Sequence, residues 1–87
     1  MSLPSLPDGL VAVVKRDCPT CELVATALVA LAAGPGDVTV FSQDDPTFPA
    51  DAPWVIFDDE LCVSWHHSIE TVPTLLRVVD GAEAARI

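Results

Sequence analysis

Positive charge is scarce in this chain. Only four of its 87 residues are Lys or Arg, against 13 Asp or Glu, which gives a net charge of −9. Phosphate backbones and anionic lipid surfaces repel such a protein, so nucleic-acid and membrane partners are not expected. No apolar run approaches the roughly 18 residues that a membrane-spanning helix needs, and Met1 to Pro4 show neither the basic nor the apolar part of a signal peptide. We therefore expect a cytoplasmic protein.

Cysteine is also scarce. The chain has three, and an odd number cannot all pair within one chain, which argues against the disulfide framework of small secreted proteins. There is no internal repeat, low-complexity tract or linker. Apolar residues make up 51% of the chain, enough for one hydrophobic core. We predict a single domain over residues 1–87, with apolar surface left over for a neighbour.

The first half of the chain predicts a strand, a helix and a second strand. Leu10 to Lys15 is a nearly continuous apolar run rich in β-branched residues, as in a strand covered on both faces. From Glu22 to Ala33 apolar residues recur at helical spacing, and Gly34-Pro35-Gly36 ends the helix. Asp37 to Ser42 contains the second strand. Together these elements form a βαβ unit, whose crossover is almost always right-handed.

The middle of the chain predicts a loop and a second helix. Gln43 to Pro53, with three prolines and three aspartates, is typical of an exposed loop. Trp54 to Phe57 is either a short strand or a plug over the core. Asp58 or Asp59 can cap a helix that runs to about His67. One face of that helix would carry Leu61, Trp65 and Ile69.

The most informative feature is Cys18-Pro19-Thr20-Cys21, a C-x-x-C motif between the first strand and the helix. We expect Cys18 at the N-cap and Pro19 at the first helical position, where its missing N–H costs nothing. A helix N-terminus stabilises a thiolate, so the pKa of Cys18 should fall and Cys18 should be the exposed nucleophile. Cys21, one turn further on, should be the buried resolving thiol, which makes the pair a reversible switch.

A second signal is Thr71-Val72-Pro73-Thr74, directly before an apolar strand. A proline at the start of a strand, after a helix and a short turn, is compatible with a cis peptide bond, although only about 5–6% of X-Pro bonds are cis. Thr74 to Val79 and Ala82 to Ile87 then flank Asp80-Gly81. This dipeptide between two strand-like runs is a strong β-hairpin signal.

Taken together, these features resemble the thioredoxin family: C-P-x-C at a helix start, T-V-P-T further along, and a hairpin with Asp-Gly at its turn. The resemblance covers Leu10 to Ile87. It implies an α/β, thioredoxin-like fold in which the βαβ unit is followed by a helix and a β-hairpin in a mixed sheet. It also implies thiol–disulfide oxidoreductase activity on disulfide-containing protein substrates, an upstream reductase as partner, and no cofactor besides the redox-active Cys18–Cys21 pair.

The resemblance further implies roles for single residues. Cys18 is the nucleophile and Cys21 the resolving thiol. Pro73 follows a cis peptide bond and lies against the disulfide, while Val72 offers backbone hydrogen bonds to a bound substrate. The substrate-binding residues are then those of the two motifs: Pro73, Val72, Thr71, Pro19 and Thr20.

This chain departs from the family's usual pattern at several positions. Asp17 stands where many thioredoxins have Trp, and Ala12 where many bury an acid that assists proton transfer to the resolving thiol. Pro19-Thr20 replaces the usual pair between the cysteines. The terminal helix that the family places after the hairpin is absent, which indicates a truncated domain, the N-terminal part of a longer protein, or a face covered by a second copy or a downstream domain. A non-enzymatic thioredoxin-like docking or assembly module is therefore a second hypothesis.

A zinc-binding module is the third hypothesis. Cys18, Cys21 and Cys62 would complete a Cys₃His ligand set with His66 or His67. The helix-capped C-P-x-C followed by T-V-P-T fits redox chemistry better, so we expect no metal. Cys62 is then a small apolar helix residue, and the two histidines are polar residues at a helix end.

The aromatic and acidic residues have simpler interpretations. We expect Trp54 and Trp65 in the core or at its rim, with Trp65 beside the dithiol as the alternative. A divalent-cation site is a weaker alternative for the acidic residues, because their spacing matches no calcium-binding loop. Solvated loop surface and helix caps are expected for Asp44, Asp45, Asp51, Asp58, Asp59 and Glu60.

Overall fold

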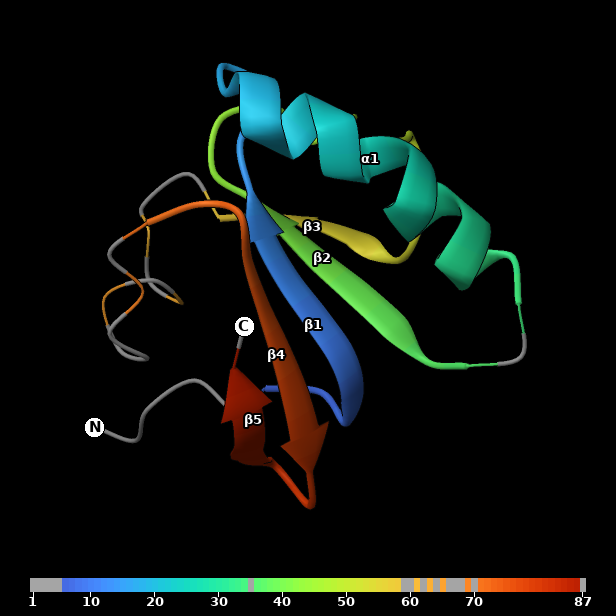
Figure 1. The fold of residues 1–87 in the computed structure, drawn as a ribbon, viewed down its shortest axis with the longest axis vertical. Helices are drawn as coiled ribbons and strands as arrows, with labels where there is room; N and C mark the ends of the chain where they lie inside the picture. The colour runs from blue at the N-terminus through green and yellow to red at the C-terminus, as the bar shows by residue number, and fades with distance from the viewer. Residues whose placement is uncertain are drawn as a thin grey trace.

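The protein is an α/β domain in which one face of a mixed five-stranded sheet carries helix α1 (Figure 1). The computed structural model describes residues 6–34, 36–58, 61, 63, 65, 69 and 71–86. In chain order the elements are β1 (Gly9–Val14), α1 (Pro19–Ala32), β2 (Val38–Ser42), β3 (Val55–Phe57), β4 (Thr74–Val79) and β5 (Ala82–Arg86). No helix within these described ranges is both long enough and apolar enough to cross a membrane.

The strand order is β3-β2-β1-β4-β5, so the first strand of the chain lies at the centre of the sheet. Strand β1 pairs parallel with β2 and antiparallel with β4. The predicted βαβ unit is therefore confirmed, and so is the antiparallel placement of the hairpin. In the stretch 54–57, which the sequence left open between strand and plug, Val55–Phe57 form β3, a parallel edge strand beside β2.

The central strand separates two hydrophobic layers, because successive side chains of a strand point to opposite faces. Val11 and Val13 face the layer away from α1, and Ala12 and Val14 face the helix. Burial of all four explains the unbroken apolar run of this strand. The layer away from α1 also contains Leu6, Phe41, Val63, Ile69, Leu76 and Val78.

The hairpin forms as predicted. Asp80 and Gly81 both have positive φ, 52° and 78°, which matches the right-handed twist of the flanking strands and suits Asp-Gly. The Gly81 N–H donates to the Asp8 carboxylate at 2.8 Å, so the turn is tied to the segment that precedes β1. Every residue of β5 is exposed.

An apolar groove of about 640 Å³ lies beside the C-terminal half of α1. Leu10, Leu31, Val38 and Leu75 contribute to its lining, and Arg77 and Ala85 bring β4 and β5 to it. Helix α1 adds further apolar surface, because Leu23 is 80% exposed and Leu31 50%. This is the location of the leftover apolar surface that the composition predicts.

The predicted helix between Asp58 and His67 falls mostly outside the described residues, which include only Leu61, Val63 and Trp65 of its interior. The predicted apolar face is wrong for two of its three members: Ile69 is buried, but Leu61 and Trp65 are exposed, Trp65 by 80%. Val63 is buried in their place. Leu61 has a left-handed φ of 57°, so a single helical face does not run through it. Trp65 is therefore not a core or rim residue, whereas Trp54 packs against the layer that contains Cys21.

Candidate functional site: a dithiol at the start of helix α1

Cys18 occupies the N-cap of α1, as predicted. Its backbone is extended, with φ −157° and ψ 109°, and Pro19 follows at the start of the helix. The Cys18 sulfur accepts a hydrogen bond from the Cys21 N–H at 3.3 Å. A thiol thus takes the position where Ser or Asp usually satisfies an unpaired N–H, and the partial positive charge of the helix end favours its ionised form.

The two thiols lie in different surroundings. Cys18 is half-buried, with Pro19 and Thr20 exposed beside it, whereas Cys21 has no exposed surface. Cys21 packs in the layer between α1 and the sheet. The other buried members of that layer are Ala12, Val14, Leu28, Val40 and Phe48. Both cysteines are free thiols, so the structure shows the reduced pair.

The surroundings move the two pKa values in opposite directions. Hydrogen bonding from the Cys21 thiol and then from the Cys21 N–H lowers the pKa of Cys18, and burial opposes these two larger effects. The Thr20 N–H and the charge of Lys15 lower this pKa by smaller amounts. Burial, followed by the hydrogen bond with Cys18, raises the pKa of Cys21 to about 11. The pair therefore combines a half-buried thiol whose pKa is lowered with a buried thiol whose pKa is raised.

The T-V-P-T segment faces this pair, as predicted. The Val72–Pro73 peptide bond is cis, and the Val72 carbonyl oxygen lies 3.9 Å from the Cys18 sulfur. The Thr71 carbonyl accepts a hydrogen bond from the Thr74 hydroxyl at 2.5 Å, which ties the turn to the start of β4. A second cis bond, Phe48–Pro49, was not predicted. Residues 71–73 and 18–21, although far apart in the chain, border one site.

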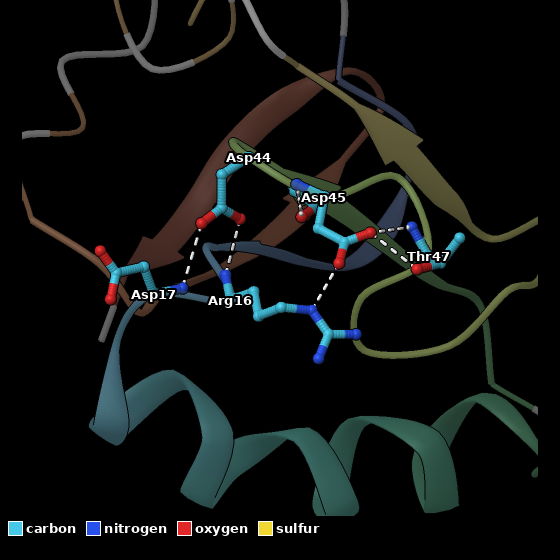
Figure 2. Close-up of polar contacts among 6 residues, drawn as sticks. Arg16, Asp17, Asp44, Asp45 and Thr47 are labelled. Atoms are coloured by element: carbon cyan, nitrogen blue, oxygen red, sulfur yellow. Dashed lines mark hydrogen bonds and ion pairs between the residues drawn. The ribbon is translucent and has the colours of Figure 1, made fainter.

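Two acidic residues that we expected to be solvated loop surface are bonded to the turn before Cys18 (Figure 2). Asp44 accepts from the backbone N–H groups of Arg16 and Asp17, and Asp45 pairs with the Arg16 guanidinium. Asp44 is exposed, as expected, and Asp45 is half-buried, but the sequence did not predict the bonds of either residue to this turn. A sequence signal existed: the aspartates follow β2 after one intervening residue, Gln43, and the carboxyl ends of the parallel strands β1 and β2 meet at one edge of the sheet.

Metal ligation is not supported within the described part of the chain. Among those residues no group of three or more His, Cys, Asp or Glu side chains could hold a metal ion. The further ligands of the zinc hypothesis, Cys62, His66 and His67, lie outside the described residues, as do Asp59 and Glu60. Asp58 is buried and accepts a hydrogen bond from the Val63 N–H, five residues further on, at 3.2 Å. An N-cap side chain accepts from an N–H two or three residues on, so this contact does not show the predicted cap.

Comparison of the chain with protein-family models, with curated proteins and with solved structures finds no match.

Proposed function

We propose that this protein is a thiol–disulfide oxidoreductase of thioredoxin-like fold that acts on disulfide-containing protein substrates. The observation that carries the proposal is the inequality of the two thiols: Cys18 at a helix N-cap with a lowered pKa, and Cys21 buried with a raised one. Unequal thiols of this kind suit an attacking and a resolving role. The strand order and the approach of the Val72 carbonyl to the Cys18 sulfur support the same proposal.

Reduction of a substrate would proceed in two exchanges. The Cys18 thiolate attacks one sulfur of the substrate disulfide, a mixed disulfide forms, and the other substrate sulfur leaves as a thiolate. Cys21 then loses its proton to that thiolate and attacks the Cys18 sulfur, and the second substrate sulfur leaves and takes a proton from solvent. The substrate gains two electrons and two protons, and Cys18–Cys21 becomes a disulfide. An upstream reductase, itself a dithiol donor, returns the pair to the reduced state.

The residues around the pair would hold the substrate. Pro19, Thr20 and Thr71 are exposed at its border, and Val72 and Pro73 are half-buried beside Cys18. By resemblance to thioredoxins, the Val72 backbone would bind an extended substrate segment. Such a reaction needs a reducing compartment to supply electrons, so we place the protein in the cytoplasm.

One departure from thioredoxins bears on the rate of the second exchange. Ala12, at the position where many thioredoxins bury an acid, is fully buried in the same layer as Cys21. Alanine cannot accept the proton of Cys21. Resolution of the mixed disulfide would therefore depend on the substrate thiolate as the base, and we expect it to be slower than attack.

The direct test is to trap the mixed disulfide. Cys21→Ser, mixed with insulin, should accumulate a mixed disulfide between Cys18 and an insulin chain, because attack on an insulin disulfide proceeds and resolution cannot. Cys18→Ser, the matched control, should form no adduct and show no activity. Activity of the wild type without any adduct in Cys21→Ser would contradict the assigned roles.

A non-enzymatic docking or assembly module is the second candidate, and the apolar groove beside α1 favours it. In that case the dithiol would be incidental. Cys18 would titrate like a free cysteine, and no reductase would turn the protein over. Measured turnover with a dithiol donor excludes this candidate.

A further inference from the structure

We propose that Asp44 is a positioning residue for the nucleophile, acting through the turn that delivers Cys18 to the start of α1. The inference rests on the proposed function and deepens it, since it names a residue outside both cysteine and proline motifs on which Cys18 depends. Asp44 does not touch Cys18. It acts through two hydrogen bonds, to the Arg16 and Asp17 N–H groups, which together we name the Asp44 contact.

The geometry of the Asp44 contact fixes the turn immediately before the nucleophile (Figure 2). One carboxylate oxygen, Oδ1, accepts from the Arg16 N–H at 2.7 Å, and the other, Oδ2, accepts from the Asp17 N–H at 3.0 Å. The next N–H, that of Cys18, donates to the Arg16 carbonyl at 2.8 Å. Three successive N–H groups are thereby fixed, and the extended backbone of Cys18 follows from them.

A second set of contacts holds the same turn from the side. The Arg16 guanidinium pairs with Asp45 and lies 5.4 Å from the centre of the Phe48 ring. Asp45 also accepts from the Thr47 N–H at 2.8 Å and from the Thr47 hydroxyl at 2.7 Å. Phe48 is buried in the layer that contains Cys21. The segment 44–48 therefore connects the turn before Cys18 with the packing around Cys21.

The contact has two opposite electrostatic consequences for Cys18. By holding the turn it keeps the sulfur where the Cys21 N–H can donate to it, which lowers the pKa of Cys18. By its negative charge a carboxylate near a thiolate would raise that pKa. Two N–H donors already meet the charge of Asp44. Among the described residues, the other charged groups near Cys18 are Lys15, Arg16, Asp17 and Asp45, together with Glu22 in the first turn of α1. The pKa of Cys18 should therefore depend more on how Asp44 positions the sulfur than on the negative charge of Asp44.

The test compares Asp44→Ala and Asp44→Asn with Asp51→Ala, which removes an exposed carboxylate from the same loop between β2 and β3. The measurement is the pH dependence of alkylation of Cys18 by iodoacetamide in the reduced protein, followed by mass spectrometry of its peptide. Asp44→Ala should raise the pKa of Cys18 and slow alkylation near neutral pH by about fivefold, as expected for a lost N-cap hydrogen bond. In Asp44→Asn the pKa of Cys18 should lie between those of the wild type and Asp44→Ala, because the amide oxygen replaces one of the two acceptors. In Asp51→Ala the pKa of Cys18 should match that of the wild type.

Two results would overturn the inference. A lower pKa of Cys18 in Asp44→Ala would show that only the charge of Asp44 matters, and an unchanged pKa would show that the contact does not position the sulfur. Asp44→Asn keeps the size of the side chain and carries the test if Asp44→Ala does not fold.

Failure of the proposed function gives a different result. If Cys18 of the wild type titrates as an ordinary thiol, the proposed function is contradicted whatever the variants do. The Asp44 contact is then tested separately by amide hydrogen exchange: the Arg16 and Asp17 amides should exchange faster in Asp44→Ala by tenfold or more, on the order expected for losing a hydrogen bond. Equal exchange in the two proteins contradicts the contact itself.

Discussion

At the scale of single residues, the site is defined by two identical side chains in different surroundings. Cys18 and Cys21 are three positions apart, yet one caps the helix and is half-buried while the other has no exposed surface. The hydrogen bond from Cys21 to Cys18 moves both pKa values, lowering that of Cys18 and raising that of Cys21. The same contact therefore makes Cys18 easier to ionise and Cys21 harder to ionise.

The raised pKa of Cys21 predicts that the reduced protein loses stability in alkali. Between about pH 9, the ordinary value of the thiol, and about pH 11, the unfolded chain releases a proton that the folded protein retains. The free energy of unfolding should therefore fall as pH rises through this window. Cys18 has the opposite effect on the free energy of unfolding. Its lowered pKa contributes stability that is fully present above pH 9 and is lost as the pH falls through the pKa of Cys18 in the folded protein.

Urea unfolding of the reduced protein across that window checks the Cys21 prediction. Cys21→Ala, the matched variant, should show a smaller alkaline loss than the wild type. The chain contains no tyrosine, so no phenol titrates in the same range. An identical loss in both proteins would contradict the assigned environment of Cys21.

The residue-level chemistry was predictable only where it follows from local spacing. Two cysteines at the start of a helix imply a cap and a buried partner, whatever the rest of the chain does. Asp44 is 28 residues from Arg16, so its partner could have been predicted only from the parallel pairing of the first two strands and not from local spacing. The exposure of Trp65 was missed for a related reason: helical spacing predicts one face, and the left-handed Leu61 interrupts it.

At the scale of elements, α1 combines a narrow buried stripe with an apolar exposed surface. Only Cys21 and Leu28 of the helix are buried, and Glu22 is its one charged residue. Most of the stability that the helix contributes should therefore come from a few side chains near Leu28. This concentration is unusual for a helix that is apolar on nearly all sides, which is normally buried.

Truncation of two leucines in α1 tests this distribution. Leu28→Ala should cost about 2–5 kcal/mol, since it leaves a cavity between helix and sheet. Leu23→Ala is the matched control, because Leu23 is 80% exposed, and it should change the free energy of unfolding by less than about 0.5 kcal/mol. Urea unfolding of the two variants gives both values. Equal losses of unfolding free energy in the two variants would contradict the burial of Leu28 and the exposure of Leu23.

The order of the elements was largely predictable, and their packing was not. Unbroken apolar runs, Gly-Pro punctuation and Asp-Gly at a turn each specify a local structure, which is why β1, α1, β2 and the hairpin were expected. Strand β3 is too short for periodicity to separate it from irregular structure. Its pairing with β2 is a long-range contact, and local sequence does not encode such contacts.

At the scale of the whole molecule, the dithiol and the apolar groove lie at opposite ends of α1. The dithiol is at the N-terminus of the helix, and the groove adjoins Ala30 and Leu31 near its C-terminus. A neighbour bound at the groove would leave the dithiol accessible. The homodimer or downstream domain that the composition suggests is thus compatible with redox activity.

Substitution in the groove reports whether a second copy covers it. Leu31 is 50% exposed in the protomer, so Leu31→Gln should change the free energy of unfolding by less than about 0.5 kcal/mol if the protein is monomeric. The unfolding midpoint should then be independent of protein concentration. A larger loss, together with a midpoint that rises with concentration in the wild type, would show that the groove is an interface between copies.

The most direct measurement for the proposed chemistry is the titration of the individual thiols. Carbon-13 NMR of reduced protein labelled at the cysteine Cβ atoms follows each thiol separately, and the Cys18→Ser and Cys21→Ser variants assign the signals. We predict that Cys18 titrates below the ordinary value of 9.0 and that Cys21 titrates near 11. Titration of both thiols together, near the ordinary value, would contradict the division into nucleophile and resolving thiol.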